Sequence, residues 1–327
     1  MDNLLDITSL HVDFYLDKKT IPAINGLNLS IKKEKTLGIV GESGCGKSVL
    51  ALSIMGLIPP PGKITKGKIW FRYNQSEIDL VKINFKSKLM RSIRGNKISM
   101  IFQEPMTSLN PVFTIGDQII ETIRIHQNVN YTVSKQRTIN ILKEVGYPEP
   151  EKRIYDYPHQ LSGGMLQRVM IAMALVCKPL LLIADEPTTA LDVTIQAQVL
   201  RLMNEIKKGF KPTIMFITHD LGVIAKMADE VAIMYVGEIV ELASVNEIFS
   251  NAKHPYTIGL LQSIPTLNRQ RNILLNTIKG NVPNPGEIKY GCNFYPRCPQ
   301  VMKKCNNEKP KLIKLSNKQE VSCLLYS

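Results

Sequence analysis

The residues best placed to do chemistry are the eight from Gly41 to Ser48. They fit the pattern G-x-x-x-x-G-K-[ST], in which glycines let the backbone wrap an anion and successive N–H groups face phosphate oxygens. In that pattern Lys47 supplies a positive charge for the β- and γ-phosphates, and the Ser48 hydroxyl is a ligand for Mg2+. The alternative is a glycine turn that merely joins a strand to a helix. The candidate phosphate-binding residues are Gly41, Glu42, Ser43, Gly44, Cys45, Gly46, Lys47, Ser48 and Val49.

A pair of carboxylates, Asp185 and Glu186, follows an apolar run at residues 180–184. An Asp in this place can hold Mg2+, and the next carboxylate can orient or deprotonate an attacking water. Taken alone the pair is weak evidence, because many such acids are surface residues at the end of a strand. In a chain that also carries a phosphate loop, the pair indicates phosphoryl-transfer chemistry.

A second glycine-containing segment, Leu161-Ser162-Gly163-Gly164, opens a predicted helix over residues 163–177. Ser162 is a suitable N-cap, and the two glycines bare the amides of the first turn, which makes a second anion site. The alternative is an ordinary Ser-capped core helix. Each glycine costs about 1 kcal/mol of helix propensity, so structure alone does not favour two of them here.

Four short apolar runs lead into this chemistry, at residues 36–40, 98–102, 180–184 and 213–217. They precede the phosphate loop, Gln103, Asp185 and His219 respectively. Short runs that are apolar on both faces and separated by helical segments are typical of a buried parallel sheet. Ligands bind beyond the carboxyl ends of such strands. We therefore predict an α/β fold in which the four polar clusters meet at one edge of the sheet.

The remaining pattern predicts further elements around this sheet. Antiparallel strands are predicted at residues 4–15, 23–31 and 64–73. A later hairpin is predicted from the strands at residues 231–235 and 238–242. Residues 115–127 and 133–145 read as amphipathic helices of an inserted helical subdomain, at about 109–160. From residue 254 the periodicity fades while Pro and Gly become frequent. We expect one domain over residues 1–253 and an irregular extension over 254–327.

Composition narrows the possible classes of protein. The 327 residues carry a net charge of +13, and residues 269–318 hold eleven Lys and Arg against two Glu. This basic stretch is either a solvated face or a contact with an anionic membrane surface. Nucleic acid is not favoured, because no nucleic-acid-binding motif accompanies the charge and aromatics are 6%. The absence of a long apolar run and of a secretory start predicts a cytosolic protein.

Four of the six cysteines, Cys292, Cys298, Cys305 and Cys323, cluster in the basic extension, whereas Cys45 and Cys177 stand alone. Clustered thiols in a cytosolic protein more often bind metal than form disulfides. Four thiolates suit a 4Fe-4S cluster or a tetrahedral Zn2+. The spacing C-x5-C-x6-C-x17-C lacks the close pairs of structural zinc sites, which favours iron–sulfur. Zinc and four free thiols remain the alternatives.

Taken in chain order, the motifs resemble the ATP-binding subunit of ABC transporters over residues 5–250. The five motifs are the phosphate loop, Gln103, the LSGGM-Q segment at Leu161 (below, the LSGG segment), Asp185-Glu186 with Ala190-Leu191-Asp192, and His219. The resemblance implies a P-loop NTPase fold of the ABC ATPase type, with a parallel core sheet, an antiparallel β-subdomain and a helical subdomain. It also implies ATP and Mg2+ as ligands.

The resemblance assigns roles by position. In the reaction it implies Glu186 as the general base, His219 as a γ-phosphate contact and Lys47 as a phosphate ligand, with Gln103 sensing Mg2+ and the attacking water. It implies that Mg2+ is held by Ser48, Gln103 and Asp185. It places Ser162, Gly163 and Gly164 against ATP bound to the opposite subunit, and Asp192 at the subunit interface. The adenine is expected to stack on Tyr15, with Phe14 as the alternative.

Residues 103–111, 189–198 and 254–257 resemble the di/oligopeptide importer branch, which also handles nickel and glutathione. The four cysteines resemble the extension of its D-type subunit, some members of which hold a 4Fe-4S cluster. The implied function is an ATPase that energises import of dipeptides or oligopeptides, with nickel or glutathione as alternative substrates. The implied partners are a homologous ATPase in a heterodimer, two multi-span membrane subunits and, indirectly, an extracytoplasmic substrate-binding protein. The implied location is the cytoplasmic face of the cell membrane.

Two other classes are weaker. An ABC-type ATPase that acts on nucleic acid or ribosomes would usually show a coiled-coil insertion or tandem cassettes, and the sequence has neither. A regulatory nucleotide-binding module without turnover would not need Glu186 and His219.

Overall fold

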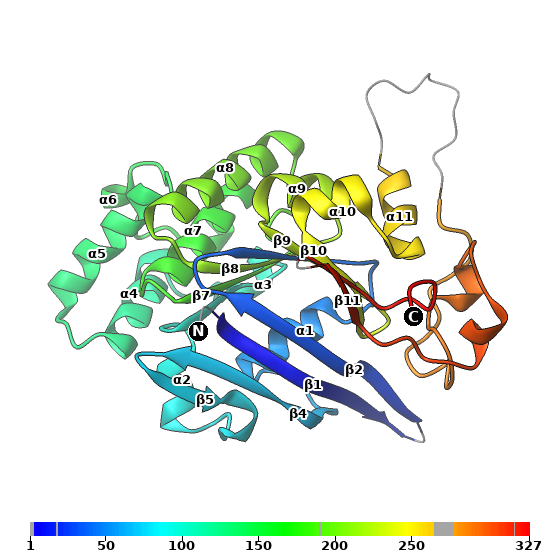
Figure 1. The fold of residues 1–327 in the computed structure, drawn as a ribbon. Coiled ribbons are helices and arrows are strands. Elements are labelled where there is room, and N and C mark those ends of the chain that lie inside the picture. The colour runs from blue at the N-terminus through cyan, green and yellow to red at the C-terminus, as the bar shows by residue number, and fades with distance from the viewer. Residues whose placement is uncertain (1–2, 18, 190, 265–276, 317) are drawn as a thin grey trace. The chain divides into compact units, whose positions relative to one another are not determined.

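The computed structural model describes residues 3–17, 19–189, 191–264, 277–316 and 318–327 (Figure 1). Its contacts divide the chain into two compact units. One unit combines Met1–Lys82 with Thr218–Ser327, and the other is Ile83–Ile217. The predicted boundary between a domain over residues 1–253 and an extension over 254–327 rests on the sequence pattern, not on contacts, and stays a prediction.

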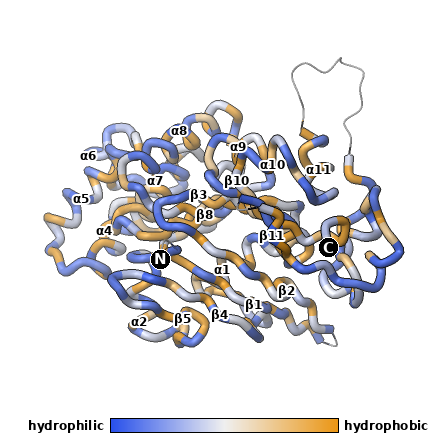
Figure 2. Tube along the Cα trace, in the orientation of Figure 1, coloured by the Kyte–Doolittle hydropathy of each residue, from blue (hydrophilic) through white to orange (hydrophobic). Residues whose placement is uncertain are grey.

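The first unit contains an antiparallel sheet in the order β2-β1-β4-β5, which confirms the three predicted strands and adds a fourth. Its strands are β1 (Asn3–Leu16), β2 (Lys19–Lys32), β4 (Gly62–Tyr73) and β5 (Ser76–Asp79). Figure 2 shows hydrophobic and hydrophilic residues alternating along the longer strands. This alternation buries one face of the sheet, because successive side chains of a strand point to opposite sides.

A second group of strands in this unit carries the phosphate loop, in the order β11-β12-β10-β9-β3. The strands are β3 (Thr36–Val40), β9 (Glu230–Tyr235), β10 (Glu238–Ser244), β11 (Ile313–Ser316) and β12 (Gln319–Val321). β3 runs parallel to β9, and the other pairs are antiparallel. All five residues of β3 are buried, as its continuous apolar run predicts.

The end of the C-terminal extension belongs to these strands. β12 pairs with β10, with Glu241 opposite Val321, so the extension is not irregular throughout. The helices of the unit are α1 (Lys47–Met55), α9 (Leu221–Met227), α10 (Val245–Asn251) and α11 (Pro255–Gln262). Short 3-10 turns occur at Leu80–Lys82, Tyr295–Arg297 and Lys303–Asn306. In the described part of the chain, no helix is long and apolar enough to cross a membrane.

The second unit holds three parallel strands in the order β8-β7-β6, and helices around them. The strands are β6 (Ile98–Ile101), β7 (Leu181–Asp185) and β8 (Thr213–Thr218), and all are buried. The helices are α2 (Lys88–Ile93), α3 (Pro105–Ser108), α4 (Ile115–His126), α5 (Tyr131–Glu144), α6 (Pro150–Arg153), α7 (Gly163–Leu175) and α8 (Val193–Gly209), with a 3-10 turn at Pro158–Gln160. The predicted parallel strands and amphipathic helices are therefore present, and α7 ends two residues earlier than predicted.

Candidate functional site

The phosphate loop joins β3 to α1 through glycines whose backbone other residues rarely adopt. Gly44 and Gly46 have φ of 81° and 102°, in the left-handed region where glycine has no steric penalty. A Cβ on Gly46 would lie 2.7 Å from the carbonyl oxygen of Ala23, whereas one on Gly44 would meet no atom within 4 Å. The loop is thus packed against β2 on one side and open beside Gly44. An open space at the N-terminus of a helix fits a phosphate.

Lys47 supplies the charge of this cradle. Its side chain is buried, and Nζ donates to the backbone oxygens of Gly41 (2.8 Å) and Glu42 (3.1 Å). These carbonyls hold the ammonium over the loop, where it can meet a phosphate bound by the amides. Cys45 contributes its backbone, because its side chain is 1% exposed and burial raises the pKa of its thiol.

Glu186 lies at the carboxyl end of β7, in a backbone conformation with φ of 46°. Its carboxylate accepts a hydrogen bond from Gln103 Nε2 at 3.3 Å and from Thr189 Oγ1 at 2.8 Å. β6 and β7 are parallel, so Gln103 and Glu186 leave the sheet at the same edge. Two of the predicted catalytic residues are therefore in contact, and Thr189 is a partner that the sequence interpretation did not include.

The acid that precedes it, Asp185, is the last residue of β7 and is 3% exposed. A carboxylate at the carboxyl end of a buried strand suits a Mg2+ ligand that acts through water. His219 follows β8 and is exposed. The prediction that the phosphate loop and His219 meet Gln103 and Glu186 at one edge stays a prediction.

The LSGG segment begins α7 as predicted, but its serine does not cap the helix through its side chain. Ser162 is the N-cap residue and makes no side-chain capping bond. Ser162 and Gly163 are both exposed, so an anion can reach the first turn of α7. Gly164 has a packing role as well, because a Cβ there would lie 2.8 Å from Cγ2 of Ile195 on α8.

Asp192 and Tyr15 are the two remaining residues predicted to act in nucleotide binding. Asp192 caps α8, since its carboxylate accepts from the backbone N–H groups of Thr194 and Ile195, both at 3.0 Å. Tyr15 lies near the end of β1 with 46% of its surface exposed, whereas Phe14 is half-buried. An exposed aromatic ring can serve as a stacking platform, so the preference for Tyr15 as the adenine partner stays a prediction.

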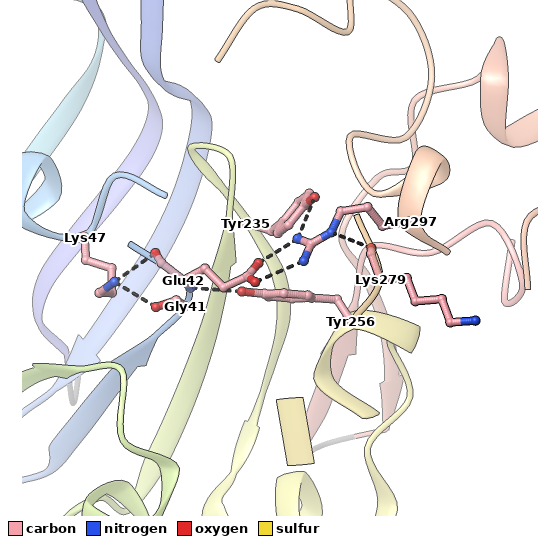
Figure 3. A network of polar contacts seen from close by, with 7 residues as sticks. All are labelled: Gly41, Glu42, Lys47, Tyr235, Tyr256, Lys279 and Arg297. Carbon is pink, nitrogen blue, oxygen red and sulfur yellow. Dashed lines mark hydrogen bonds and ion pairs between the residues drawn. The ribbon is translucent and has the colours of Figure 1, made fainter. Parts of the chain in front are cut away.

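A polar network that sequence reasoning missed connects the phosphate loop with the C-terminal extension (Figure 3). Arg297 forms a two-point ion pair with the carboxylate of Glu42, with distances of 2.7 and 3.0 Å. Tyr256 Oη accepts the backbone N–H of Glu42 at 3.0 Å. In the sequence, Arg297 stands out only because it directly precedes Cys298. That position does not indicate that its partner, Glu42, lies 255 residues away in the chain.

A second missed residue, Glu241, anchors the start of the extension. It is fully buried, and its carboxylate accepts from the backbone N–H groups of Lys253 (2.8 Å) and His254 (2.9 Å) and from Gln319 Nε2 (2.8 Å). His254 Nδ1 in turn accepts the N–H of Tyr256 at 3.1 Å and caps α11. Burial lowers the pKa of His254 from 6.5 to about 3, so its imidazole is neutral at physiological pH.

The four cysteines of the extension are all free thiols, and Cys305 and Cys323 are buried. Burial, with a smaller contribution from the other three cysteines, raises the pKa of Cys292 to about 12. Neighbouring backbone N–H groups, those of Phe294, Gln300 and Leu325, act in the opposite direction and lower the pKa of the cysteine two residues earlier. Among the residues that the structure describes, no group of three or more His, Cys, Asp or Glu side chains is placed to hold a metal ion.

Comparison with known families gives two matches. Residues 24–189 match the family model described as ABC transporter, and residues 240–305 match the one described as oligopeptide/dipeptide transporter, C-terminal region. The second match spans Glu241, His254, Tyr256 and Arg297, and it ends at Cys305.

Among curated proteins, the chain is 49% identical over 327 residues to the oligopeptide transport ATP-binding protein AppD of Bacillus subtilis, covering 100% of this chain and 98% of that one. It is 45% identical over 307 residues to the oligopeptide transport ATP-binding protein OppD of Salmonella typhimurium, covering 94% of this chain and 89% of that one. Among solved structures, it resembles the dimeric ATP-binding cassette MJ0796 bound to ADP and Pi, with a TM-score of 0.65, 25% identity and coverage of 74% and 98%. It also resembles cbiO1 of Clostridium perfringens, with a TM-score of 0.62, 26% identity and coverage of 80% and 96%.

Proposed function

The chain belongs to the ATP-binding subunits of ABC transporters, and on that premise we propose that it hydrolyses ATP to drive import of oligopeptides or dipeptides. The observation that carries the hydrolytic part is the carboxylate of Glu186, held by Gln103 and Thr189 beyond a buried strand. A carboxylate oriented in this way can accept a proton from an attacking water. Full-length similarity to oligopeptide and dipeptide transport ATP-binding proteins supports the peptide substrate.

We assign the remaining roles by position in the motifs. Lys47 and the amides of the phosphate loop would hold the triphosphate, and Ser48, Gln103 and Asp185 would hold Mg2+, which supplies charge neutralisation when bound. His219 would contact the γ-phosphate and Tyr15 the adenine. Exposed Ser162 and Gly163, together with Gly164, would contact ATP held by a second ATPase subunit, with Asp192 at the interface.

The proposed partners follow from the same branch. A homologous ATPase would complete a heterodimer, two multi-span subunits would form the pathway, and an extracytoplasmic binding protein would deliver the substrate. The chain would then sit at the cytoplasmic face of the membrane. We also propose that Cys292, Cys298, Cys305 and Cys323 hold a 4Fe-4S cluster, on the ground of their number and their spacing in the sequence.

The transport proposal is tested by uptake in cells that lack this chain. Cells complemented with the wild-type chain should take up labelled di- and oligopeptides, and cells complemented with Lys47→Ala should not. Labelled nickel and glutathione, offered to the same cells, distinguish the alternative substrates. Uptake of nickel or glutathione but not peptide would overturn the peptide assignment, and peptide uptake that is independent of this chain would overturn the transport proposal.

A further inference from the structure

Glu42 is held at three points by groups that surround the phosphate loop (Figure 3). Its backbone N–H donates to Tyr256 Oη, its backbone oxygen accepts from Lys47 Nζ, and its carboxylate pairs with Arg297. Tyr256 and Arg297 come from the chain beyond residue 253. A P-loop residue is thus positioned largely by the C-terminal extension.

The pair between Arg297 and Glu42 is strong in its geometry. Nη1 lies 2.7 Å from Oε2 and Nη2 lies 3.0 Å from Oε1, which is the parallel two-bond arrangement that guanidinium and carboxylate favour. The Arg297 side chain is 4% exposed, against 30% for Glu42. A buried guanidinium requires such a partner, because an unpaired buried charge is costly.

Every nitrogen of the guanidinium has a partner within the same unit. Nε donates to the backbone oxygen of Lys279 at 3.2 Å, and Nη1 also donates to Tyr235 Oη at 3.3 Å. The side chains of Tyr235, Tyr256 and Phe294 pack against one another beneath it, with ring centroids 4.6 to 5.4 Å apart. The guanidinium is therefore locked in place before any nucleotide arrives.

We propose that Arg297 is a positioning residue for nucleotide binding, which holds the Glu42 carboxylate away from the phosphate cradle and compensates its charge. The cradle must accept a polyanion, and Glu42 is adjacent to Gly41 within it. A free carboxylate there would repel the phosphates, since like charges at short range oppose binding. Lys47 can leave the Glu42 carbonyl for a phosphate, while Arg297 and Tyr256 keep the residue in place.

The test compares four forms of the full chain by the Kd of Mg-ATP, measured by calorimetry, and by KM and kcat for ATP hydrolysis. Arg297→Gln should raise Kd and KM about five- to tenfold, equivalent to roughly 1–1.4 kcal/mol, with kcat changed less than about twofold. The double variant Glu42→Gln/Arg297→Gln should return Kd to within about twofold of wild type, because the carboxylate that repels phosphate is gone. Lys311→Gln, an exposed charge removed from the same extension, should leave Kd unchanged.

Two results would overturn the proposal. One is an unchanged Kd in a folded Arg297→Gln variant, and the other is a double variant as weak as or weaker than the single one, which would indicate a structural role alone. If Arg297→Gln loses its cooperative thermal transition, Arg297→Lys replaces it, since Lys keeps the charge but not the two-point geometry. That variant should raise KM about two- to threefold with kcat retained, and an unchanged KM would reject the positioning role.

Discussion

Gln103 donates to the carboxylate of Glu186 across 3.3 Å, although the two residues are 83 positions apart in the chain. Parallel pairing of β6 with β7 brings them together, because each residue follows the carboxyl end of its strand. Thr189 donates to the same carboxylate oxygen as Gln103. The arrangement leaves Glu186 hydrogen-bonded and oriented at the edge of the sheet.

Replacing Glu186 with Gln should lower ATP turnover by on the order of 10²-fold or more, because an amide cannot accept the proton of the attacking water. ATP binding should persist, so that an ATP-bound dimer accumulates. Steady-state hydrolysis and size-exclusion chromatography with ATP measure the two effects. Glu205→Gln, at an exposed position of α8, is the matched control and should hydrolyse normally. Wild-type turnover in Glu186→Gln would show that another group is the base.

The two glycines of the LSGG segment should respond differently to Ala. At Gly164 the new Cβ would lie 2.8 Å from Ile195, so Gly164→Ala should cost about 1–3 kcal/mol of overpacking. At Gly163 the nearest atom would be 3.7 Å away, so thermal unfolding should show no loss of stability. Gly163→Ala should nevertheless reduce hydrolysis by the assembled transporter, since the new methyl group would occupy space that the proposal gives to ATP. Full activity of Gly163→Ala would remove that role.

Protonation of His254 should make the folded protein less stable as the pH falls. Its pKa is about 3 when folded, against 6.5 as the ordinary value, so between these values the unfolded chain binds more protons than the folded one. The free energy of unfolding should therefore decrease as pH falls from about 6.5 towards 3, by up to about 1.4 kcal/mol per pH unit. Urea unfolding at several pH values measures the slope.

The matched variant for this effect is His254→Asn. An Asn side chain can still cap α11 by accepting the N–H of Tyr256, but it does not titrate. The pH dependence over the same range should be shallower in this variant. An identical slope in both proteins would assign the acid sensitivity to other groups.

Anaerobically purified protein should be brown and contain about four irons per chain. Cys298→Ala should lose the colour and the iron, whereas Cys177→Ala, outside the extension, should keep both. Metal analysis and visible absorbance decide the result. A colourless preparation with one zinc per chain would replace the cluster by zinc, and a preparation without metal would end the proposal.

The purified chain should be mostly monomeric and weakly active, because one subunit would supply the phosphate loop and another the LSGG segment for each ATP. Purification from its native membrane should recover a homologous ATPase and two multi-span proteins. A fully active homodimer that transports with one kind of membrane subunit would contradict the heterodimer.

The local sequence was sufficient to predict those elements whose ends are marked by nearby residues, such as apolar runs and glycines. The buried strand at Thr36–Val40 follows from a continuous apolar run, and Gly44 and Gly46 supply the left-handed backbone of the phosphate loop. The LSGG and Asp-Glu motifs were recognisable because their chemistry lies in adjacent residues. Membership of the ABC ATPases was therefore predictable from the chain itself, and the motifs also named Gln103 and Glu186, which the structure brings into contact.

Contacts between distant segments were decided by the tertiary structure. Nothing near Arg297 in sequence specifies Glu42 as its partner, and nothing near Glu241 predicts the N–H groups of Lys253 and His254. The close approach of Gly164 to Ile195 likewise depends on how α7 packs on α8. Hydropathy patterns and turn residues report the conformation of a segment, whereas a buried polar side chain pairs with whichever group the fold brings within reach.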